Sequence, residues 1–324
     1  MAIKDLVGLT EPLKKLIEVV SQGVGTLYEP IHIKRMAKAK AEEIKTITSA
    51  INEVNLPVQY SNGQIIIDTS TQEFIQRTER RLLFQETKKQ KNIEDIVANA
   101  YNNLETEESV SSEPIQEEWT NRFFNIVGEI SSDDLKFIWG KVLSEEIKSP
   151  GKCSIRTLEV LKNLSRTEAE VFKKIANYII ISKDHYHFNN DVYYLPNEKD
   201  ILEEVNISYN QILLLDEVLL MKQSSSIALT IKFNETVKTR YLLYNDYFAI
   251  LENSNVSGEI RLPVYILTKA GQEIFNIINC TTEKEYFIKF LNKIKQKGLK
   301  VCYGKIVQKL PDGIEYEKDD MINI

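Results

Sequence analysis

The sequence predicts an α+β protein that is mainly helical, with long amphipathic helices first, a central helical bundle and a smaller α+β C-terminal domain. Apolar residues recur every three or four positions through most of residues 1–181, which is the period of a helix face. After residue 181, tyrosine and β-branched residues gather in short runs, which favours strands. We therefore predict an amphipathic leader, a hairpin or loop with a long charged helix, a central helical domain and an α+β domain, at residues 1–51, 52–110, 111–181 and 182–324.

The leader carries one apolar stripe that is divided into two helical pieces. Gly23, Gly25 and Pro30 interrupt the stripe, and the second piece, residues 33–51, is rich in lysine and alanine. This segment can pack within the protein, contact a partner or a second subunit, or lie on an anionic membrane surface, and all three readings stay open. The candidate interaction residues are Leu6, Leu9, Leu13, Leu16, Val20, Val24, Leu27, Lys34, Arg35 and Lys38.

The second segment begins with a turn signal and continues as a charged helix. Pro57 and the Asn62-Gly63 pair, beside a short β-branched run, predict a small hairpin or an extended loop. The helical period then returns over residues 72–104. Its expected apolar contacts are Phe74, Leu82, Phe84, Ile93, Ile96, Val97 and Ala100.

The central domain has the clearest helix boundaries. Ser132 ahead of Asp133 and Asp134 predicts one helix start, and Ser165 with Glu168 predicts a capping box at another. Large aromatic residues are expected to build the helical core, because each fully buried one contributes about 2–3 kcal/mol. The main core candidates are Trp119, Phe123, Phe124 and Trp139, with Phe137 beside them. An internal ion-pair network is expected among Lys141, Glu145, Glu146 and Arg156.

The last domain alternates short strands with helices. Strands are predicted within residues 185–195, 226–233, 247–251 and 260–268, and helices near residues 208–220, 269–278 and 282–297. The order of helix, strand pair and Leu-Thr-Lys-Ala-Gly also occurs in winged-helix domains. Asp216 and Glu217 stand where DNA contact needs basic residues, so a winged-helix-like module that binds protein is favoured over a DNA reader.

The sequence contains no pattern typical of a catalytic or cofactor site. It has no Gly-x-x-x-x-Gly-Lys-Ser/Thr loop, no Gly-x-Gly-x-x-Gly after a strand and no Gly-x-Ser-x-Gly turn. His185 and His187 would share one face of a strand, but no further metal ligands accompany them in a pattern. Cys153 has no histidine close in sequence to activate it. We therefore expect no catalytic, cofactor-binding or metal-binding residues, no cofactor, and a protein that is not an enzyme.

Charge and hydropathy limit the partners and the location that we expect. With 41 Lys and Arg against 47 Asp and Glu, the net charge is −6, which disfavours nucleic acid as a partner. No window of about 18 apolar residues is present, and the first residues lack the apolar core of a signal peptide. A cytoplasmic protein is expected, with membrane association upon activation as the alternative.

The middle of the chain resembles an uncharacterised bacterial group, domain-of-unknown-function family 2806. The resemblance covers residues 90–104 and 117–172 and, more loosely, residues 267–275. The residues that carry it are Trp119, Phe123, Phe124, Trp139, Gly140, Lys141, Leu143, Glu146, Ile147, Pro150, Gly151, Ser154, Arg156, Thr157, Leu158 and Leu161. No catalytic residues are established for the family, so the resemblance implies none here.

Residues 8–44 are similar to the leader found in this family and in the abortive-infection group called Abi-alpha. This similarity implies a role in bacterial defence against phage. We expect a non-enzymatic interaction or assembly protein of antiphage defence, which self-associates or binds a partner through its N-terminal helices. The alternatives are a membrane-directed toxic effector that inserts its N-terminal segment, a metal-dependent hydrolase, and a winged-helix DNA-binding regulator.

Overall fold

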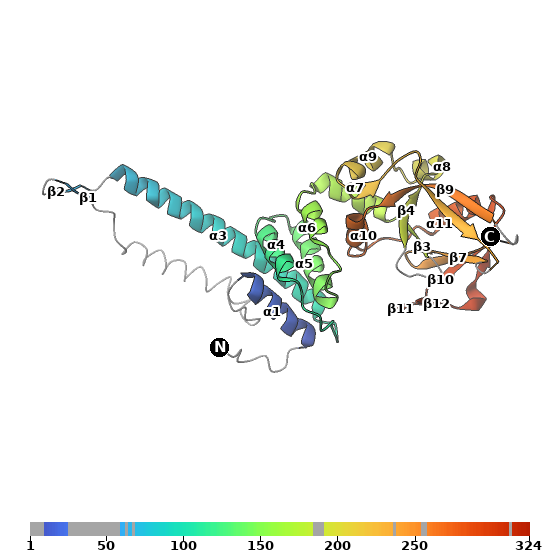
Figure 1. The fold of residues 1–324 in the computed structure, drawn as a ribbon, viewed down its shortest axis with the longest axis horizontal. Helices are drawn as coiled ribbons and strands as arrows, with labels where there is room; N and C mark the ends of the chain where they lie inside the picture. Colours follow the sequence, from blue (N-terminus) through green and yellow to red (C-terminus); the bar gives the residue numbers. More distant parts are fainter. Residues whose placement is uncertain are drawn as a thin grey trace. The chain divides into compact units, whose positions relative to one another are not determined.

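The protein is described here from a computed structural model, which describes residues 10–24, 59–61, 64–66, 69–183, 191–235, 238–253, 258–310 and 313–324. It is an α+β protein with a helical N-terminal half and a strand-rich C-terminal part (Figure 1). The chain divides into two compact units, residues 1–153 and 154–324. The division falls before the predicted boundary at residue 181, because α6 (Ile155–Lys162) packs on α10 (Lys269–Phe275) and α7 (Arg166–Ala176) on α9 (Tyr209–Glu217), within the second unit.

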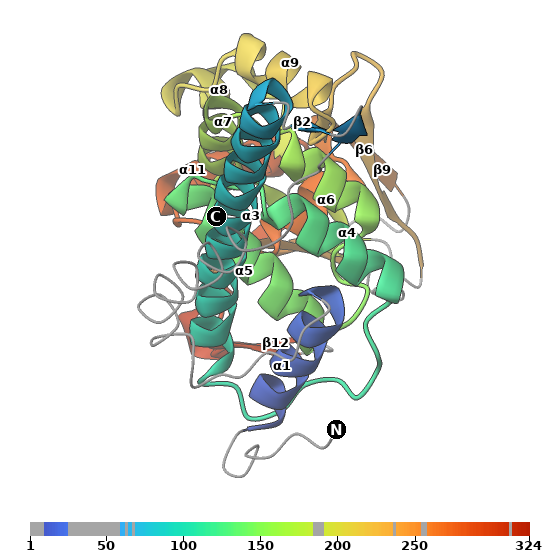
Figure 2. The ribbon, with the colours of Figure 1, turned by 90° about the vertical axis from the view of Figure 1, so that its left-hand side faces the viewer.

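The first unit is a helical bundle with a small hairpin. Its longest element, α3, has 36 residues. Figure 2 shows α1, α4 and α5 on one side of α3. The two short strands pair antiparallel on either side of Asn62 and Gly63, so the hairpin alternative is confirmed. The elements are α1 (Glu11–Val24), β1 (Gln59–Ser61), β2 (Gln64–Ile66), α3 (Thr69–Leu104), α4 (Glu117–Val127) and α5 (Asp133–Lys148).

Aromatic rings, one pair stacked and two pairs edge to face, form the centre of the first unit. Trp119, Phe123, Phe124 and Trp139 are only 3, 0, 6 and 0% exposed. The Phe123 ring lies 5.0 Å from Trp119, 5.2 Å from Phe124 and 5.6 Å from Trp139, measured between ring centres. The indole of Trp119 also donates a hydrogen bond to the carbonyl of Cys153 at 2.7 Å. Phe137 differs from our expectation: it is 48% exposed, because its side of α5 faces solvent.

A glycine sets the approach of α5 to α3. A Cβ at Gly140 would lie 2.5 Å from Cβ of Asn99 and 3.1 Å from the amide nitrogen of Ala100. These distances are too short for any side chain, so the two helices pack closely only with glycine here. At the start of α5, Asp133 and Asp134 occupy the first turn as predicted, although the Ser132 side chain makes no capping hydrogen bond.

The second unit joins helices to a largely antiparallel sheet. Its helices are α6 (Ile155–Lys162), α7 (Arg166–Ala176), α8 (Lys199–Glu204), α9 (Tyr209–Glu217), α10 (Lys269–Phe275), α11 (Lys284–Lys295) and the 3-10 turn η2 (Lys318–Asp320). Its strands are β3 (Ile180–Lys183), β4 (Val192–Pro196), β5 (Met221–Lys222), β6 (Ala228–Phe233), β7 (Thr239–Tyr244), β8 (Tyr247–Glu252), β9 (Gly258–Leu267), β10 (Lys300–Lys305), β11 (Gln308–Leu310), β12 (Gly313–Glu315) and β13 (Ile322–Asn323).

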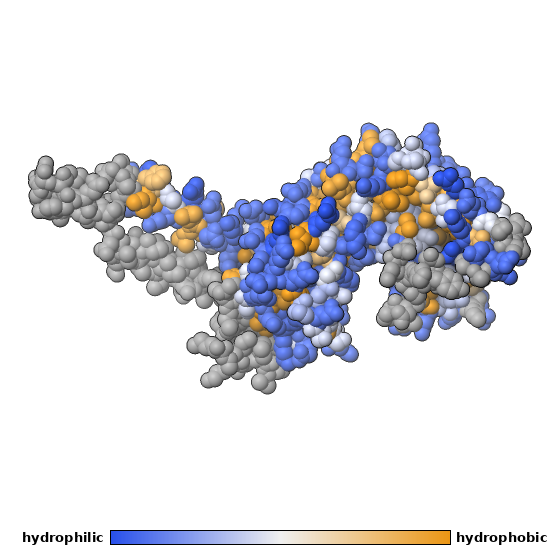
Figure 3. Space-filling view, viewed as in Figure 1, coloured by the Kyte–Doolittle hydropathy of each residue, from blue (hydrophilic) through white to orange (hydrophobic). Residues whose placement is uncertain are grey.

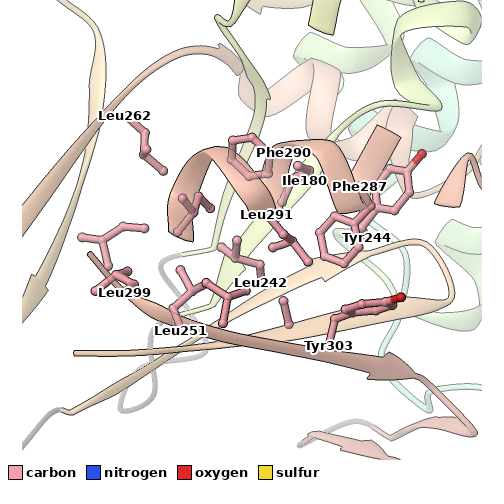
Figure 4. Close-up of a cluster of buried hydrophobic side chains, with 14 of the residues drawn as sticks. Ile180, Leu242, Tyr244, Leu251, Leu262, Phe287, Phe290, Leu291, Leu299 and Tyr303 are labelled. Atoms are coloured by element: carbon pink, nitrogen blue, oxygen red, sulfur yellow. The ribbon is translucent and has the colours of Figure 1, made fainter. Parts of the chain in front are cut away.

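The main sheet has the strand order β13-β10-β8-β7-β3-β4-β9-β5, and β6 pairs with β9. Helix α11 packs on this sheet and supplies Tyr286, Phe287, Phe290, Leu291 and Ile294 to the core. Figure 4 shows Phe287, Phe290 and Leu291 of α11 in one cluster with strand residues, among them Leu242, Leu251 and Tyr303. Ser165 forms its capping box with Glu168, and Ser208 forms a second one with Gln211.

The strands of the second unit do not pair in the order that our winged-helix comparison assumes. A wing is a hairpin of consecutive strands, whereas β6 pairs with β9 and the hairpin of β7 and β8 lies between them in the chain. The structure therefore shows the α+β class, but it does not confirm a winged-helix arrangement of the C-terminal domain. Strands β3, β5, β7, β10, β11, β12 and β13 had no counterpart among the predicted strands; β3 begins where the predicted helical domain was expected to end, and β10 pairs with β8.

Candidate functional site

The apolar stripe of the leader is part of the protein's own core where the structure describes it. Leu13, Leu16 and Val20 in α1 are 5, 2 and 0% exposed, and Val24 is half-buried. Helix α1 packs against α4, α3 and α5. The other candidate interaction residues lie outside the described residues; they are Leu6, Leu9, Leu27, Lys34, Arg35 and Lys38.

Two contacts hold α1 in this place. The ammonium group of Lys15 donates to the backbone carbonyls of Ser111 and Glu113, both at 2.7 Å, and burial lowers the pKa of Lys15. Gly23 lies so close to Phe124 that a Cβ would be 2.0 Å from the ring. Helix α1 is therefore built into the bundle, and its buried stripe is not a free binding surface.

The helices that pack on α3 begin or end at nearly the same level along it: α1 and α4 end there, and α5 begins there. Asn92 in α3 donates to the carbonyl of Gly128, just beyond the end of α4, at 2.8 Å. Lys136, in the first turns of α5, contacts the Asp95 carboxylate of α3 at 2.6 Å. Gly23, near the end of α1, lies beside Phe124 in the second half of α4.

The part of α3 before this level, residues 69–88, therefore extends past α1, α4 and α5 (Figure 1). At 1.5 Å per residue this half of the helix is roughly 30 Å long. Among residues 73–88, every side chain is exposed except that of Thr78, which is half-buried. Apolar residues gather on this exposed half of the helix, as Figure 3 shows.

The exposed apolar side chains of this half form the candidate site. Phe74 is 63% exposed, Leu82 49% and Phe84 71%, although we expected all three to pack against the protein. Ile75 and Leu83 are each 36% exposed. Large apolar side chains rarely stay uncovered in such a group, and a group of this kind marks an interaction surface. We call Phe74, Ile75, Leu82, Leu83 and Phe84 the α3 arm patch.

Ile75 and Leu82 of the α3 arm patch continue the buried face of the same helix, whereas Phe84 lies on its opposite side. Ile96, Val97, Ala100 and Leu104 are at most 1% exposed in the second half of α3. Ile75 and Leu82 precede Ile96 by multiples of seven residues, so they lie on nearly the same side of the helix. One apolar face therefore runs along α3, and the helices that the structure describes around it cover its second half and not its first.

The acidic residues of the central domain have structural partners. Glu145 contacts Lys152 and lies 3.2 Å from the ammonium of Lys148, which also contacts Glu107 at 2.6 Å. Burial alone would raise the pKa of Glu145, but the two lysines outweigh burial and hold this pKa below its usual value. The expected network therefore forms in part: Lys141 attracts Glu145 electrostatically and also lies over the ring of Phe137, Lys148 and Lys152 join it, and Arg156 is exposed.

Two buried carboxylates bind backbone rather than a substrate. Glu146 accepts hydrogen bonds from the amides of Gly151 and Cys153, at 2.7 and 2.9 Å. In the second unit, Glu273 accepts from the amide of Ser154 and the hydroxyl of Thr157, at 2.7 and 2.6 Å. Their oxygens hold the turn after α5 and the first turn of α6.

The three thiols are poorly suited to nucleophilic chemistry. Cys153 is 1% exposed. Burial raises the pKa of Cys280 to about 11 and also raises that of Cys302, so both stay protonated near neutral pH and are poor nucleophiles. His185 and His187 lie outside the described residues. Within the ranges that the structure describes, no three His, Cys, Asp or Glu side chains converge as a metal ion would require.

The described helices also contain no segment with the length and apolar character needed to cross a bilayer. No curated protein and no solved structure matches the chain. A family model, described as a protein of unknown function (DUF2806), matches residues 76–291. This match includes the second part of the α3 arm, the aromatic centre of the first unit and most of the second unit. The chain therefore belongs to the DUF2806 family of proteins of unknown function.

Proposed function

We propose that this protein acts without catalysis, as an interaction and assembly protein, and that the α3 arm patch is its binding surface. The observation that carries the proposal is the uncovered half of α3, where five large apolar side chains are exposed beyond the ends of α1, α4 and α5. Covering about 100 Å² of apolar surface on such side chains would stabilise a complex by about 2.5 kcal/mol. A helical partner can cover this face in the way that the bundle covers the second half of α3.

We place this activity in bacterial antiphage defence. What motivates this proposal is the resemblance, read from the sequence alone, of residues 8–44 to the leader of the abortive-infection Abi-alpha group; the family match, over residues 76–291, does not include this segment. The structure modifies how such a leader would contribute, because α1 is buried in the first unit. Removing residues 1–51 would therefore damage the bundle itself, and substitution on the arm is the sharper experiment.

The experiment compares phage protection by cells that produce the wild type or an arm variant. Ile75→Asp combined with Leu82→Asp places two charges on the apolar face and is expected to abolish protection. The matched control is Arg80→Asp, which changes an exposed charge on the opposite side of the same helix. Circular dichroism of the purified variants checks that each one folds.

Three outcomes would contradict the proposal in different ways. Absence of protection by the wild type against a broad phage panel would contradict the role in defence. Full protection by the doubly charged variant would contradict the role of the α3 arm patch. Equal loss of protection in the Arg80→Asp control would show that the helix tolerates no change, and the patch would then have no special part.

The other functions receive less support. A membrane-directed effector would have to withdraw the α1 stripe from the core, where Leu16 and Val20 are at most 2% exposed. A hydrolase would need groups that the central acids do not offer, since Glu146 is bound to backbone amides. For a DNA-binding regulator, Asp216 and Glu217 on α9 oppose contact with phosphate.

A further inference from the structure

The turn that ends α9 holds a leucine in the left-handed region of backbone conformation. Leu219 has a φ of 61°. Its amide donates to the carbonyl of Asp216 at 3.1 Å, and the amide of Leu220 donates to the carbonyl of Leu215 at 2.9 Å. These two hydrogen bonds define a helix end in which the left-handed residue is usually glycine or asparagine. Leucine is disfavoured there because its Cβ lies too close to the following carbonyl oxygen.

Helix α8 ends in the same turn without a leucine. Asn206 has a φ of 55°, and its amide donates to the carbonyl of Glu203 at 3.1 Å. The amide of Ile207 then donates to the carbonyl of Leu202 at 2.9 Å. Asparagine tolerates the left-handed region, so the backbone of this turn does not itself require leucine. The leucine at the end of α9 therefore needs another explanation.

Burial does not provide that explanation, because Leu219 is 53% exposed. The buried apolar contact of the turn comes from Leu220, which is 0% exposed. Two hydrogen bonds fix the turn to the start of α10. The Thr268 hydroxyl donates to the carbonyl of Leu219 at 2.5 Å, and the Thr268 amide donates to that of Leu220 at 3.1 Å. Leu219 is therefore held at a defined place on the surface.

A second exposed apolar side chain lies near the other end of β5. Tyr209 is 54% exposed, and its hydroxyl donates to the side-chain oxygen of Gln223 at 3.1 Å. Gln223 directly follows β5, whereas Leu219 comes two residues before it. Strand β5 is the last in the order of the main sheet. We call Tyr209 and Leu219 the β5 patch, because they border the two ends of this strand.

Two acids beside the β5 patch oppose the dipole of their own helix. Asp216 and Glu217 occupy the last turn of α9, whose carbonyls form the negative end of the helix. Lysines occupy the last turns of α7 and α11, where they are favourable. Neither Asp216 nor Glu217 forms an ion pair with any residue that the structure describes.

The bases near this turn do not cancel the two negative charges. The ammonium of Lys269 lies 3.6 Å from the carboxylate of Glu273 on its own helix. Lys222 in β5 is exposed, but it is a single base beside Asp216 and Glu217. The surface around Leu219 is therefore negatively charged and attracts cations.

The end of α9 thus combines several local choices that are unfavourable for the chain alone: a left-handed leucine, exposed apolar groups and acids at the negative end of a helix. Local rules are broken in this way mainly at functional surfaces. We infer that the β5 patch is a second binding surface, which takes a protein segment whose apolar side chains lie next to a basic residue. Leu219 and Tyr209 contact the apolar side chains, and the two acids contact the base. This inference goes beyond the proposed function, because it adds a surface in the second unit.

Three fluorescent peptides of equal length test this chemistry. Each contains two leucines, placed beside lysine in the first peptide, glutamine in the second and glutamate in the third. Fluorescence polarisation measures their binding to the full-length protein. The lysine peptide is expected to bind most tightly and the glutamate peptide most weakly, with roughly a tenfold difference in affinity between them.

Two variants test the residues of the surface. Leu219→Asn introduces the residue that α8 uses in the same turn, and it should weaken binding of the lysine peptide about tenfold. The denaturation midpoint should stay nearly unchanged, because relief of the left-handed leucine offsets the loss of its partial burial. Asp216→Lys combined with Glu217→Lys should reverse the order of the three peptides.

The controls separate this surface from other apolar groups and from the strain of the turn. Val307→Ser removes another exposed apolar side chain of the second unit, which is 64% exposed, and should leave peptide binding unchanged. Ile75→Asp with Leu82→Asp should also bind the lysine peptide like the wild type, because these changes lie on the α3 arm patch. Asn206→Leu should lower the denaturation midpoint, since it places leucine in the left-handed turn of α8.

Several results would overturn the inference. They are a wild type that binds none of the peptides, a Leu219→Asn variant that binds like the wild type, and an order of peptides that the charge reversal leaves unchanged. A large fall in the denaturation midpoint of Leu219→Asn would also overturn it, because the leucine would then have a structural role. If peptide binding fails while the arm variant still loses phage protection, only this inference fails. If the peptides bind as expected but the arm variant protects fully, the β5 patch stands and the role of the α3 arm patch fails.

Discussion

At the scale of single residues, Gly271 stands where no side chain can fit. A Cβ at this position would lie 2.0 Å from the carbonyl oxygen of Leu220, which is a backbone atom and cannot turn aside. Next to it, Thr268 donates a hydrogen bond to the carbonyl of Leu219 at 2.5 Å and caps α10. The family motif at residues 267–275 thus docks α10 onto the corner between α9 and β5.

We expect Gly271→Ala to lower the free energy of unfolding of the second unit by about 3 kcal/mol, because the added methyl group forces the backbone apart. Denaturant titration, followed by far-ultraviolet circular dichroism of the backbone, measures the loss of stability. Gly313→Ala is the control, since no atom lies within 4 Å of its added Cβ, and it should change stability by less than roughly 0.5 kcal/mol. Equal losses in the two variants would refute the steric explanation.

Residue types alone indicated that Glu146 is unusual, but not what it binds. Its partners are the amides of Gly151 and Cys153, and any sequence supplies amides at those positions. Glu273 gave no signal at all, because its partners Ser154 and Thr157 are more than a hundred residues away in the chain. A carboxylate that accepts hydrogen bonds from distant backbone amides gives no recognisable sequence pattern. An ion pair between residues one helical turn apart does give one, because its spacing is fixed.

At the scale of elements, the last turn of α5 carries a local pH dependence. Lys148 and Lys152 hold the pKa of Glu145 below its usual value of 4.5. A carboxylate whose pKa is lowered by folding stabilises the native state above the unfolded pKa, and this contribution disappears as the pH falls through the folded pKa.

We therefore expect Glu145→Gln to be less stable than the wild type near neutral pH, with a difference that shrinks once the pH falls below about 4. Chemical denaturation at a series of pH values measures the difference. Glu118→Gln is the control, because its carboxylate is 67% exposed and reaches Arg122 only at 3.6 Å. A difference between Glu145→Gln and the wild type that persists unchanged in acid would contradict the ion-pair explanation.

The helical elements could be predicted well, since their period and their boundaries are local. Ser165 with Glu168 marks α7, and Asp133 with Asp134 marks α5, as expected. The period cannot say which part of an apolar face is covered. Leu16 in α1 and Leu82 in α3 carry the same helical signal, yet the bundle buries the first and leaves the second exposed.

At the scale of the whole molecule, each unit has a core of its own. Phe123 lies at the centre of the first unit and Phe290 on α11 at that of the second, both at most 1% exposed. We expect the two units to unfold in separate steps. Phe123→Ala should lower the midpoint temperature of one step, and Phe290→Ala that of the other. Each substitution should lower the free energy of unfolding of its own unit by about 3–5 kcal/mol.

Scanning calorimetry of the wild type and both variants measures these steps. A single transition that both substitutions shift equally would mean that the units unfold as one.

The pairing of strands in the second unit was the least predictable part of the fold. β9 pairs with β4, β5 and β6, which come from separate parts of the chain, and no local pattern specifies such partners.

The uncovered half of α3 also has a thermodynamic consequence. The bundle already holds residues 89–104 of α3 as a helix, so the arm only extends an existing helix; each added residue gains one hydrogen bond that barely offsets its loss of entropy, and full stability needs other contacts. Tertiary contacts supply this stability to residues 89–104, while residues 69–88 receive it only from whatever covers them. Folding of the arm and binding to it are therefore coupled, so a partner that covers residues 69–88 also stabilises their helical conformation.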